Sequence, residues 1–290
     1  MDNVTEIKTK GVPIYELLEQ LWVVPALVKG IELKIWENPG HYEHISAVWR
    51  SVGYLDAQGL TEAGEIVVKC KGLLEYECRL IDSQLNGDKA ETVPANYEML
   101  RDGLAAYCET HLWPALRDMD KMLGLPEDAL ILDMCGGSGS YLECLLKSHP
   151  DRRGVLVDKS PQPTDGLIAT NQLSMTLEAD FKKDGQWYQE LFKPASFDVI
   201  MLNEIFHCVS KVEQHYLLTM ARALLKPDGK IIVGEQNRNF RLEWRMETYT
   251  EFGKCLDMED VCELAERSKL TADKMFGAPS HWFVILRKEA

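Results

Sequence analysis

Residues 132–146 read LDMCGGSGSYLECLL and directly follow the short apolar run ALI at 129–131. This order predicts a buried strand, a tight glycine-rich turn and the first turns of a helix, because the apolar run stops at Asp133 and helical spacing begins at Tyr141. A turn of this kind usually holds a nucleotide-like ligand near the start of its helix. The odd residue is Cys135, which stands where such turns normally carry their first glycine.

Cys135 has a small side chain, so we expect the turn to form around it as long as its φ angle is negative. We do not expect its thiol to act as a nucleophile. The eight cysteines contain no C-x-x-C pair, so free thiols are expected rather than disulfides or a zinc site.

Beyond residue 129 the chain alternates between strand-like and helix-like segments. Strands are predicted at 129–134, 153–158, 197–204, 229–236 and 282–288, and helices at 141–149, 211–225 and 258–270. This alternation is typical of an α/β fold, here a Rossmann-like, doubly wound and mostly parallel sheet. Ligands of such sheets bind outside the carboxyl ends of the strands. Residues 160–178 and 236–252 have no clear pattern and stay unassigned.

Residues 1–95 are predicted to form a separate, mainly helical domain. Helical apolar spacing runs through 14–36, and a helix, a turn, a small hairpin and a second helix follow within 45–67. This order outlines a winged-helix module, with an irregular helical cap as the alternative. The polar stretch 82–96 is the expected linker to the second domain, 96–290.

Charge argues against nucleic acid and membranes as partners. The formal net charge is -14, and the candidate recognition segment, 41–52, carries a single basic residue, Arg50. DNA binding needs several cations that neutralise phosphates, so a dimerisation or lid role is favoured and a homodimer is expected. No apolar run approaches the ~20 residues that cross a bilayer, and the N-terminus lacks a signal-peptide core, so we expect a cytoplasmic protein.

The glycine turn does not match either of two nucleotide-binding sequence motifs. Leu142 stands where G-x-G-x-x-G requires its third glycine, and the Gly-Lys-Ser/Thr of a P-loop is missing. NAD would present a pyrophosphate to this turn, whereas S-adenosylmethionine presents a sulfonium, an ammonium and a carboxylate. A carboxylate beside the turn suits the second ligand. The sequence has one, in the pattern Asp133-x-Cys135-x-Gly137-x-Gly139.

Two further acids follow at ordered spacing. Asp158 ends the strand 153–158, where an acid can accept hydrogen bonds from both ribose hydroxyls. Asp180 can accept from the adenine amine, and Phe181 offers an apolar face to the ring. Together these residues predict S-adenosylmethionine at one edge of the sheet, and Lys159 and Asn203 are added to the predicted cofactor contacts.

On these motifs the chain resembles the class I S-adenosylmethionine-dependent methyltransferases, and more narrowly the O-methyltransferases with an N-terminal winged-helix dimerisation domain, of the caffeate and hydroxyindole type. The family motif D-x-G-x-G-x-G corresponds to DMCGGSG, and the family strand that ends in L-H-[DN]-W corresponds to the strand before His207. The resemblance implies that His207 is the catalytic base. It also matches a strand ending in Glu235, which could orient the imidazole or simply end its strand.

Two departures from the family pattern stand near the predicted base. Cys208-Val209 replaces the family's Asp-Trp, and Cys255 stands where a glutamate should flank the histidine. The usual phenol-handling acid is therefore absent at that position, which argues against a plant-type phenolic acceptor.

The sequence therefore predicts methyl transfer to a small molecule, with a hydroxyl acceptor favoured and a thiol second. The alternative is a family member that binds S-adenosylmethionine but catalyses a decarboxylation, a hydroxylation or a pericyclic reaction. A regulator that senses the ligand without catalysis is disfavoured by the acidic charge. Glu204 and His207 have an E-x-x-H spacing, but no second copy exists, so no metal is expected.

Overall fold

The computed structural model describes residues 14–85, 97–181, 187–237, 255–278 and 280–289. The chain divides into two compact units, Met1–Cys78 and Arg79–Ala290. This division falls inside a helix, α4 (Lys71–Leu85), whereas the predicted boundary near residue 95 lies outside the described residues and stays a prediction.

The first unit is helical in its described part. Its elements are α1 (Ile14–Leu33), η1 (Ile35–Glu37), α2 (Glu43–Ser51), α3 (Glu62–Lys69) and the start of α4. Trp49 is fully buried and donates from Nε1 to the carbonyl oxygen of Ala26 at 3.0 Å, which ties α2 to α1. The predicted small hairpin is reduced to one antiparallel bridge between Leu55 and Leu60. The helical character is confirmed, and the winged-helix assignment stays a prediction.

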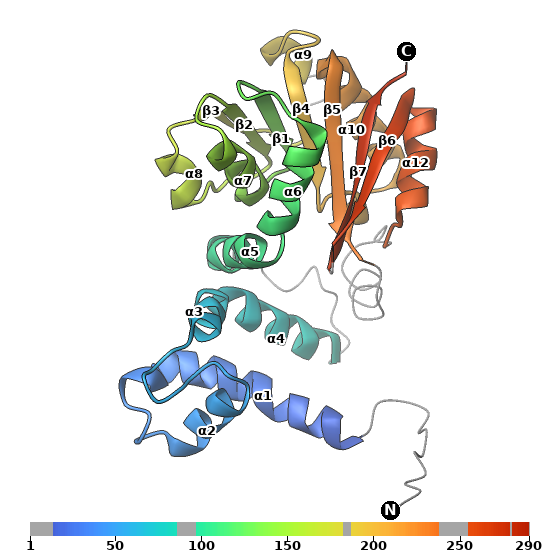
Figure 1. Cartoon of the computed structure of the whole chain (residues 1–290). Helices are drawn as coiled ribbons and strands as arrows, with labels where there is room; N and C mark the ends of the chain where they lie inside the picture. The colour runs from blue at the N-terminus through green and yellow to red at the C-terminus, as the bar shows by residue number, and fades with distance from the viewer. Residues whose placement is uncertain (1–13, 86–96, 182–186, 238–254, 279, 290) are drawn as a thin grey trace, which may run out of the picture. The chain divides into compact units, whose positions relative to one another are not determined.

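The second unit is a seven-stranded sheet with the order β3-β2-β1-β4-β5-β7-β6 (Figure 1). Its strands are β1 (Leu130–Met134), β2 (Arg153–Asp158), β3 (Leu173–Glu178), β4 (Phe197–Asn203), β5 (Leu225–Gln236), β6 (Leu270–Gly277) and β7 (His281–Lys288). Its helices are α5 (Tyr97–His111), α6 (Trp113–Leu123), α7 (Ser140–Ser148), α8 (Asp165–Ala169), α9 (Trp187–Leu191), η3 (Phe206–Cys208), α10 (Lys211–Leu224) and α12 (Met258–Arg267).

The first five strands are parallel, and β7 pairs antiparallel with both β5 and β6. The predicted doubly wound, mostly parallel sheet is therefore confirmed. The strand order reverses between β1 and β4, and the crevice above such a switch point is where these folds bind ligands. Side chains of β1 and β4 alternate between two buried clusters, one packed on α6 and α7 and the other on α10 and α12.

Two strands, β3 and β6, were not predicted. The unassigned stretch 160–178 contains α8 and β3, and β3 carries mostly exposed residues at the edge of the sheet, so it lacks the apolar pattern of the central strands. Strand β6 was missed because Leu270 was taken as the end of a helix, whereas α12 ends at Arg267 and Lys269 turns the chain with a positive φ.

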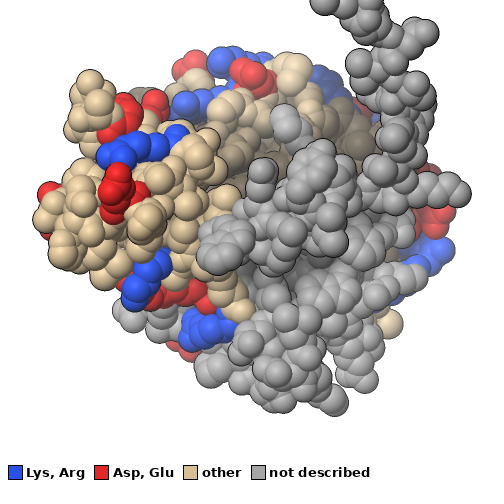
Figure 2. Space-filling view, turned by 90° about the horizontal axis from the view of Figure 1, so that it is seen from below, with Lys and Arg blue, Asp and Glu red and all other residues tan. Residues whose placement is uncertain are grey.

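The face shown in Figure 2 carries Lys and Arg side chains in small groups interspersed with Asp and Glu, over the part of the chain that is described. Of the helices in the described ranges, none has the length and apolar character to cross a membrane.

A buried ion pair holds α6 to the loop before β2. The fully buried guanidinium of Arg152 donates to both carboxylate oxygens of Asp120, at 2.7 and 2.8 Å, and to the carbonyl oxygen of Leu145 at 2.9 Å. Removing one partner leaves a buried charge without compensation.

We expect Asp120→Ala to lower the free energy of unfolding by about 3–5 kcal/mol. The matched control is Asp118→Ala on the same helix, because Asp118 forms an exposed pair with Lys121 and should cost below about 1 kcal/mol. Urea denaturation of both variants measures the difference. Equal losses in the two variants would contradict the role assigned to the buried pair.

Candidate active site

In the glycine turn between β1 and α7, every second residue has a left-handed backbone conformation. Cys135, Gly137 and Gly139 have φ values of 59°, 54° and 70°. The expectation of a negative φ at Cys135 is therefore wrong. A residue with a Cβ pays about 1–2 kcal/mol in this region, which explains why glycine is the ordinary residue at this position.

Cys135 is half-buried, and burial raises the pKa of its thiol, with further increases from the nearby acids Asp158, Asp133 and Asp180. A thiol in this setting stays protonated and is a poor nucleophile. Three of the predicted cofactor-binding acids are therefore near enough to act on the pKa of one residue of the turn.

We expect Cys135→Gly to change the free energy of unfolding by less than about 1 kcal/mol, because relief of backbone strain offsets the flexibility of glycine. Cys135→Val should lose about 1–2 kcal/mol, since a β-branched residue fits positive φ worst. Chemical denaturation and turnover of both variants provide the measurement. An inactive, folded Cys135→Gly protein would instead make the thiol part of the reaction.

Asp133 lies beneath the turn at the carboxyl end of β1. A Cβ built on Gly136 would come within 2.4 Å of its carboxyl carbon, so only glycine allows this approach. Burial, together with the smaller effect of the charge of Asp158, raises the pKa of Asp133 to about 8. Its Oδ2 atom is buried without a hydrogen-bond partner among the described residues. A cationic group placed here would stabilise the ionised form of Asp133 and would give Oδ2 a partner.

Asp158 bridges two backbone segments at the carboxyl end of β2. Its Oδ2 accepts from the backbone N–H of Gly137 at 3.0 Å, and its Oδ1 accepts from that of Ser160 at 2.9 Å. The carboxylate therefore borders the turn, with lone pairs left for other donors. The neighbouring Lys159 is exposed.

The remaining cofactor candidates follow β3 and end β4. Asp180 and Phe181 are half-buried, and Phe181 packs against the larger core cluster. The backbone N–H of Ala179 donates to the carbonyl oxygen of Asp158 at 2.9 Å, which links this segment to the end of β2. Asn203 is buried, and both side-chain amide atoms lack a hydrogen-bond partner in the described chain.

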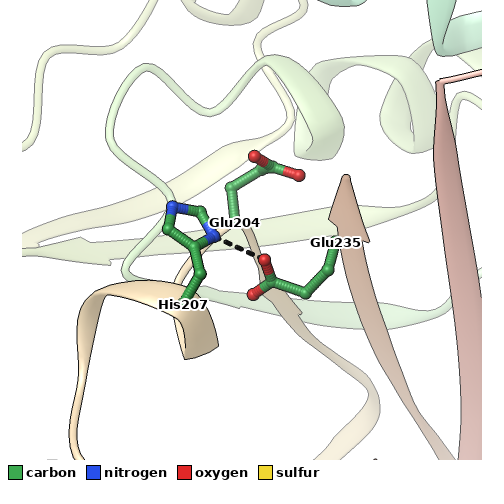
Figure 3. A group of neighbouring side chains, drawn as sticks. All are labelled: Glu204, His207 and Glu235. Carbon is green, nitrogen blue, oxygen red and sulfur yellow. Dashed lines mark hydrogen bonds and ion pairs between the residues drawn. The ribbon is translucent and has the colours of Figure 1, made fainter. Parts of the chain in front are cut away.

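His207 and Glu235 form a buried pair at the same edge. The imidazole Nδ1 lies 2.5 Å from Glu235 Oε2, and Glu235 Oε1 accepts from the backbone N–H of Phe206 at 2.7 Å. The second ring nitrogen of His207 points away from Glu235 (Figure 3). Gln214 fastens the short η3 turn by donating to the carbonyl oxygen of Phe206 at 2.8 Å. Glu235 thus fixes the orientation of the imidazole.

Burial alone would lower the pKa of His207, but the charge of Glu235 and the hydrogen bond with Cys208 raise the pKa well above 6.5. The imidazolium is therefore favoured at lower pH, and a base at this position needs a higher pH to be neutral.

Glu204 is a site residue that sequence reasoning missed. It follows β4 directly, has a φ of 55°, and places its carboxylate beside His207 and Glu235 (Figure 3). One ligand-type atom from each of these three residues lies within 4.8 Å of the others. The E-x-x-H spacing was the available signal, because the η3 turn folds His207 back toward Glu204.

This spacing would also admit a metal ion. The existing partners favour a hydrogen-bonded group instead, since Glu235 bonds to Nδ1 of His207 while Glu204 accepts from Gln236 at 2.7 Å. The absence of a metal stays a prediction.

The cavity of about 450 Å³ formed by described residues lies elsewhere, between α10 and α12. No predicted site residue lines it, so the candidate site rests on the convergence of side chains at the carboxyl edge.

Comparison with known proteins agrees with this geometry. A methyltransferase domain family model matches residues 108–272, which is more than half of the chain. The chain is 29% identical over 110 residues to 3-amino-4-hydroxybenzoate 4-O-methyltransferase of Streptomyces cremeus, covering 37% of this chain and 28% of the relative. It is 23% identical over 168 residues to phenazine-1-carboxylate N-methyltransferase of Pseudomonas aeruginosa, covering 55% of this chain and 49% of the relative. The matches thus span less than half of either relative.

Solved structures resemble the chain over nearly its whole length. An O-methyltransferase family protein from Burkholderia thailandensis superposes with a TM-score of 0.72 at 15% identity, covering 97% of this chain and 99% of that one. The O-methyltransferase NcsB1, solved with S-adenosylmethionine and 2-hydroxy-5-methyl naphthoic acid, gives a TM-score of 0.64 at 17% identity, covering 97% and 100%. With its sheet order, its glycine turn and the match over 108–272, the chain belongs to the methyltransferase domain family and has the class I S-adenosylmethionine-dependent methyltransferase fold.

Proposed function

We propose that this protein transfers a methyl group from S-adenosylmethionine to a small-molecule acceptor, with His207 as the general base. The observation that carries the proposal is the bond between Nδ1 of His207 and Glu235, at the carboxyl edge that also holds the glycine turn. Because Glu235 fixes the tautomer and the orientation of the ring, Nε2 is the atom that takes the acceptor proton.

The residues present fit S-adenosylmethionine. Asp133 Oδ2 and the amide of Asn203 are buried polar atoms without partners in the described chain, at the ends of the adjacent strands β1 and β4. Three acidic side chains, those of Asp133, Asp158 and Asp180, lie near Cys135. This acidic surround suits a sulfonium and an ammonium and repels the pyrophosphate of NAD.

When bound, S-adenosylmethionine supplies a methyl group on a good leaving group, so in-line displacement needs little beyond alignment. The proposed role of Asp158 is to hold the ribose hydroxyls, with Asp180 and Phe181 at the adenine. Lys159, Gly137 and Gly139 border the same segment. The Nε2 atom of His207 takes the acceptor proton, and Glu235 stabilises the imidazolium that forms.

This mechanism predicts a shifted pH profile. Only neutral His207 can accept a proton, and its pKa is raised well above 6.5, so turnover should fall on acidification with a midpoint above that value. Glu235→Gln removes the negative charge that raises the pKa, so its acid limb should move to lower pH while the maximal rate drops. A pH profile of turnover measures both. If the pH midpoint of turnover is the same in Glu235→Gln as in the natural protein, Glu235 is not the cause of the raised pKa.

A hydroxyl acceptor is favoured by the resemblance to O-methyltransferases. A thiol comes second, because its pKa of ~8.5 means that it needs less help from a second acid than a phenol with a pKa of ~10. The relatives include an O-methyltransferase and an N-methyltransferase, which supports methyl transfer as the reaction class. The identity of the acceptor atom is therefore tested by experiment. The experiment is release of S-adenosylhomocysteine with 3-amino-4-hydroxybenzoate and phenazine-1-carboxylate first, followed by a panel of hydroxyl and thiol compounds.

The second candidate is a reaction other than methylation on the same cofactor, and Cys208 and Cys255, which replace family acids, favour it. Consumption of acceptor without S-adenosylhomocysteine would select this alternative. We also propose that the N-terminal unit forms a homodimer, which light scattering of the purified chain tests directly.

A further inference from the structure

Cys208 is the most accessible cysteine of the chain. All eight cysteines lie in the described ranges, and Cys208 alone is exposed, whereas Cys108 and Cys144 are buried and the others are half-buried. It ends the short η3 turn, and its backbone N–H donates to the carbonyl oxygen of Ile205 at 3.0 Å. A dissolved reagent therefore reaches this thiol most easily.

Most of the other thiols stand in settings that suppress their reactivity. Burial raises the pKa of five of them, namely those of Cys70, Cys108, Cys135, Cys144 and Cys262. Because the thiolate is the nucleophile, a thiol whose pKa is raised stays protonated near neutral pH and reacts slowly.

The side chain of Cys208 stands beside a histidine that is already oriented for proton transfer. Cys208 makes a side-chain hydrogen bond with His207, and Nδ1 of His207 lies 2.5 Å from Glu235 Oε2 (Figure 3). The carboxylate of Glu235 and the amide of Gln214 also hold Phe206, the first residue of the same turn. A nucleophile, an adjacent base and a third group that orients the base form the arrangement that activates a cysteine.

We propose that Cys208 is a modification site, at which His207 activates the thiol for reaction with small-molecule disulfides. The product is a mixed disulfide on Cys208. A group attached there lies beside the imidazole and fills the space that a methyl acceptor needs, so it switches methyl transfer off. Only this loss of turnover rests on the proposed function.

The step is a thiol–disulfide exchange. The proton of Cys208 passes to the imidazole of His207 as Sγ attacks one sulfur of the disulfide. A new S–S bond forms, the old S–S bond breaks, and the leaving thiolate takes the proton from His207. The Cys208 thiol is thereby oxidised and one half of the disulfide is reduced, so the exchange needs no further oxidant.

The test uses 4,4′-dithiodipyridine, an uncharged disulfide that releases one coloured thiopyridone for each thiol that reacts. The lack of charge matters because a chain with a net charge of -14 would repel an anionic reagent. A positioned base contributes about 10²- to 10⁴-fold, and a thiol needs less help because a few per cent of it ionises unaided. One equivalent in the natural protein should therefore react at least about 10-fold faster than the thiols of the chain unfolded in urea.

Three variants assign this fast equivalent. Cys208→Ser should remove it, and Cys262→Ser should keep it, because Cys262 is a half-buried thiol of the same compact unit. His207→Gln should slow it by about 10-fold or more, since the amide cannot take the proton. A fast equivalent that survives Cys208→Ser, or a natural rate no higher than that of the unfolded chain, overturns the site. An unchanged fast rate in a folded His207→Gln protein overturns its activation by His207.

Turnover separates this inference from the proposed function. Modification of Cys208 should lower the release of S-adenosylhomocysteine to below about a tenth, because a base contributes about 10²- to 10⁴-fold and the adduct blocks access to it. Dithiothreitol should restore the release. Turnover that persists after complete modification overturns the blocking effect. A reactive Cys208 in a protein that releases no S-adenosylhomocysteine with any acceptor supports the modification site and counts against the proposed methyl transfer.

Discussion

Replacing His207 with alanine is expected to lower turnover by about 10²- to 10⁴-fold while the affinity for S-adenosylmethionine stays near that of the natural protein. The reason is that Nε2 is the proposed proton acceptor, whereas the predicted cofactor contacts come from other residues. Release of S-adenosylhomocysteine measures the first effect, and titration calorimetry measures the second.

The matched control is His215→Ala. His215 lies on α10, where its Nδ1 is 2.8 Å from the hydroxyl of Ser268, so its loss should leave turnover within a few-fold. A fully active His207→Ala protein would remove His207 from the mechanism. A loss of cofactor binding in the same variant would make its role structural.

The second large effect concerns Asp158. Asp158→Ala should weaken binding of S-adenosylmethionine by about 100-fold or more, because hydrogen bonds to a charged group contribute about 1.5–3 kcal/mol and the ribose would lose two. The substitution also removes the two hydrogen bonds that Asp158 accepts from the N–H groups of Gly137 and Ser160, and these bonds tie the carboxylate to the turn.

Glu178→Ala is the control for Asp158, because Glu178 is exposed, ends β3 and stands opposite Asp158 in the sheet register. It should bind the cofactor normally. Calorimetry on both variants gives the comparison, and an unchanged affinity in Asp158→Ala would mean that the ribose is held elsewhere.

The fold could be predicted wherever a strand is buried on both faces. β1, β2 and β4 are continuous apolar runs that end in acids or amides, and these runs signal parallel strands. β3 and β6 could not be predicted, because they lie at the two edges of the sheet and carry mostly exposed or half-buried side chains.

The candidate site followed from sequence only where a linear motif exists. Asp133 and Asp158 stand at strand ends that a pattern can locate, and His207 lies in the short η3 turn that follows β4. The left-handed backbone of Cys135 could not be foreseen, since residue type alone suggests a negative φ. The partners of Glu204 come from positions 236 and 281, and only the pairing of β5 with β7 brings these together.

The central claim is that the crevice between the carboxyl ends of β1 and β4 binds a sulfonium nucleoside. A crystal structure of the chain with S-adenosylhomocysteine tests it most directly. The account predicts the ribose at Asp158 and the adenine between Asp180 and Phe181. Nucleoside density away from this crevice, or a structure with NAD that places its pyrophosphate on the turn, would contradict it.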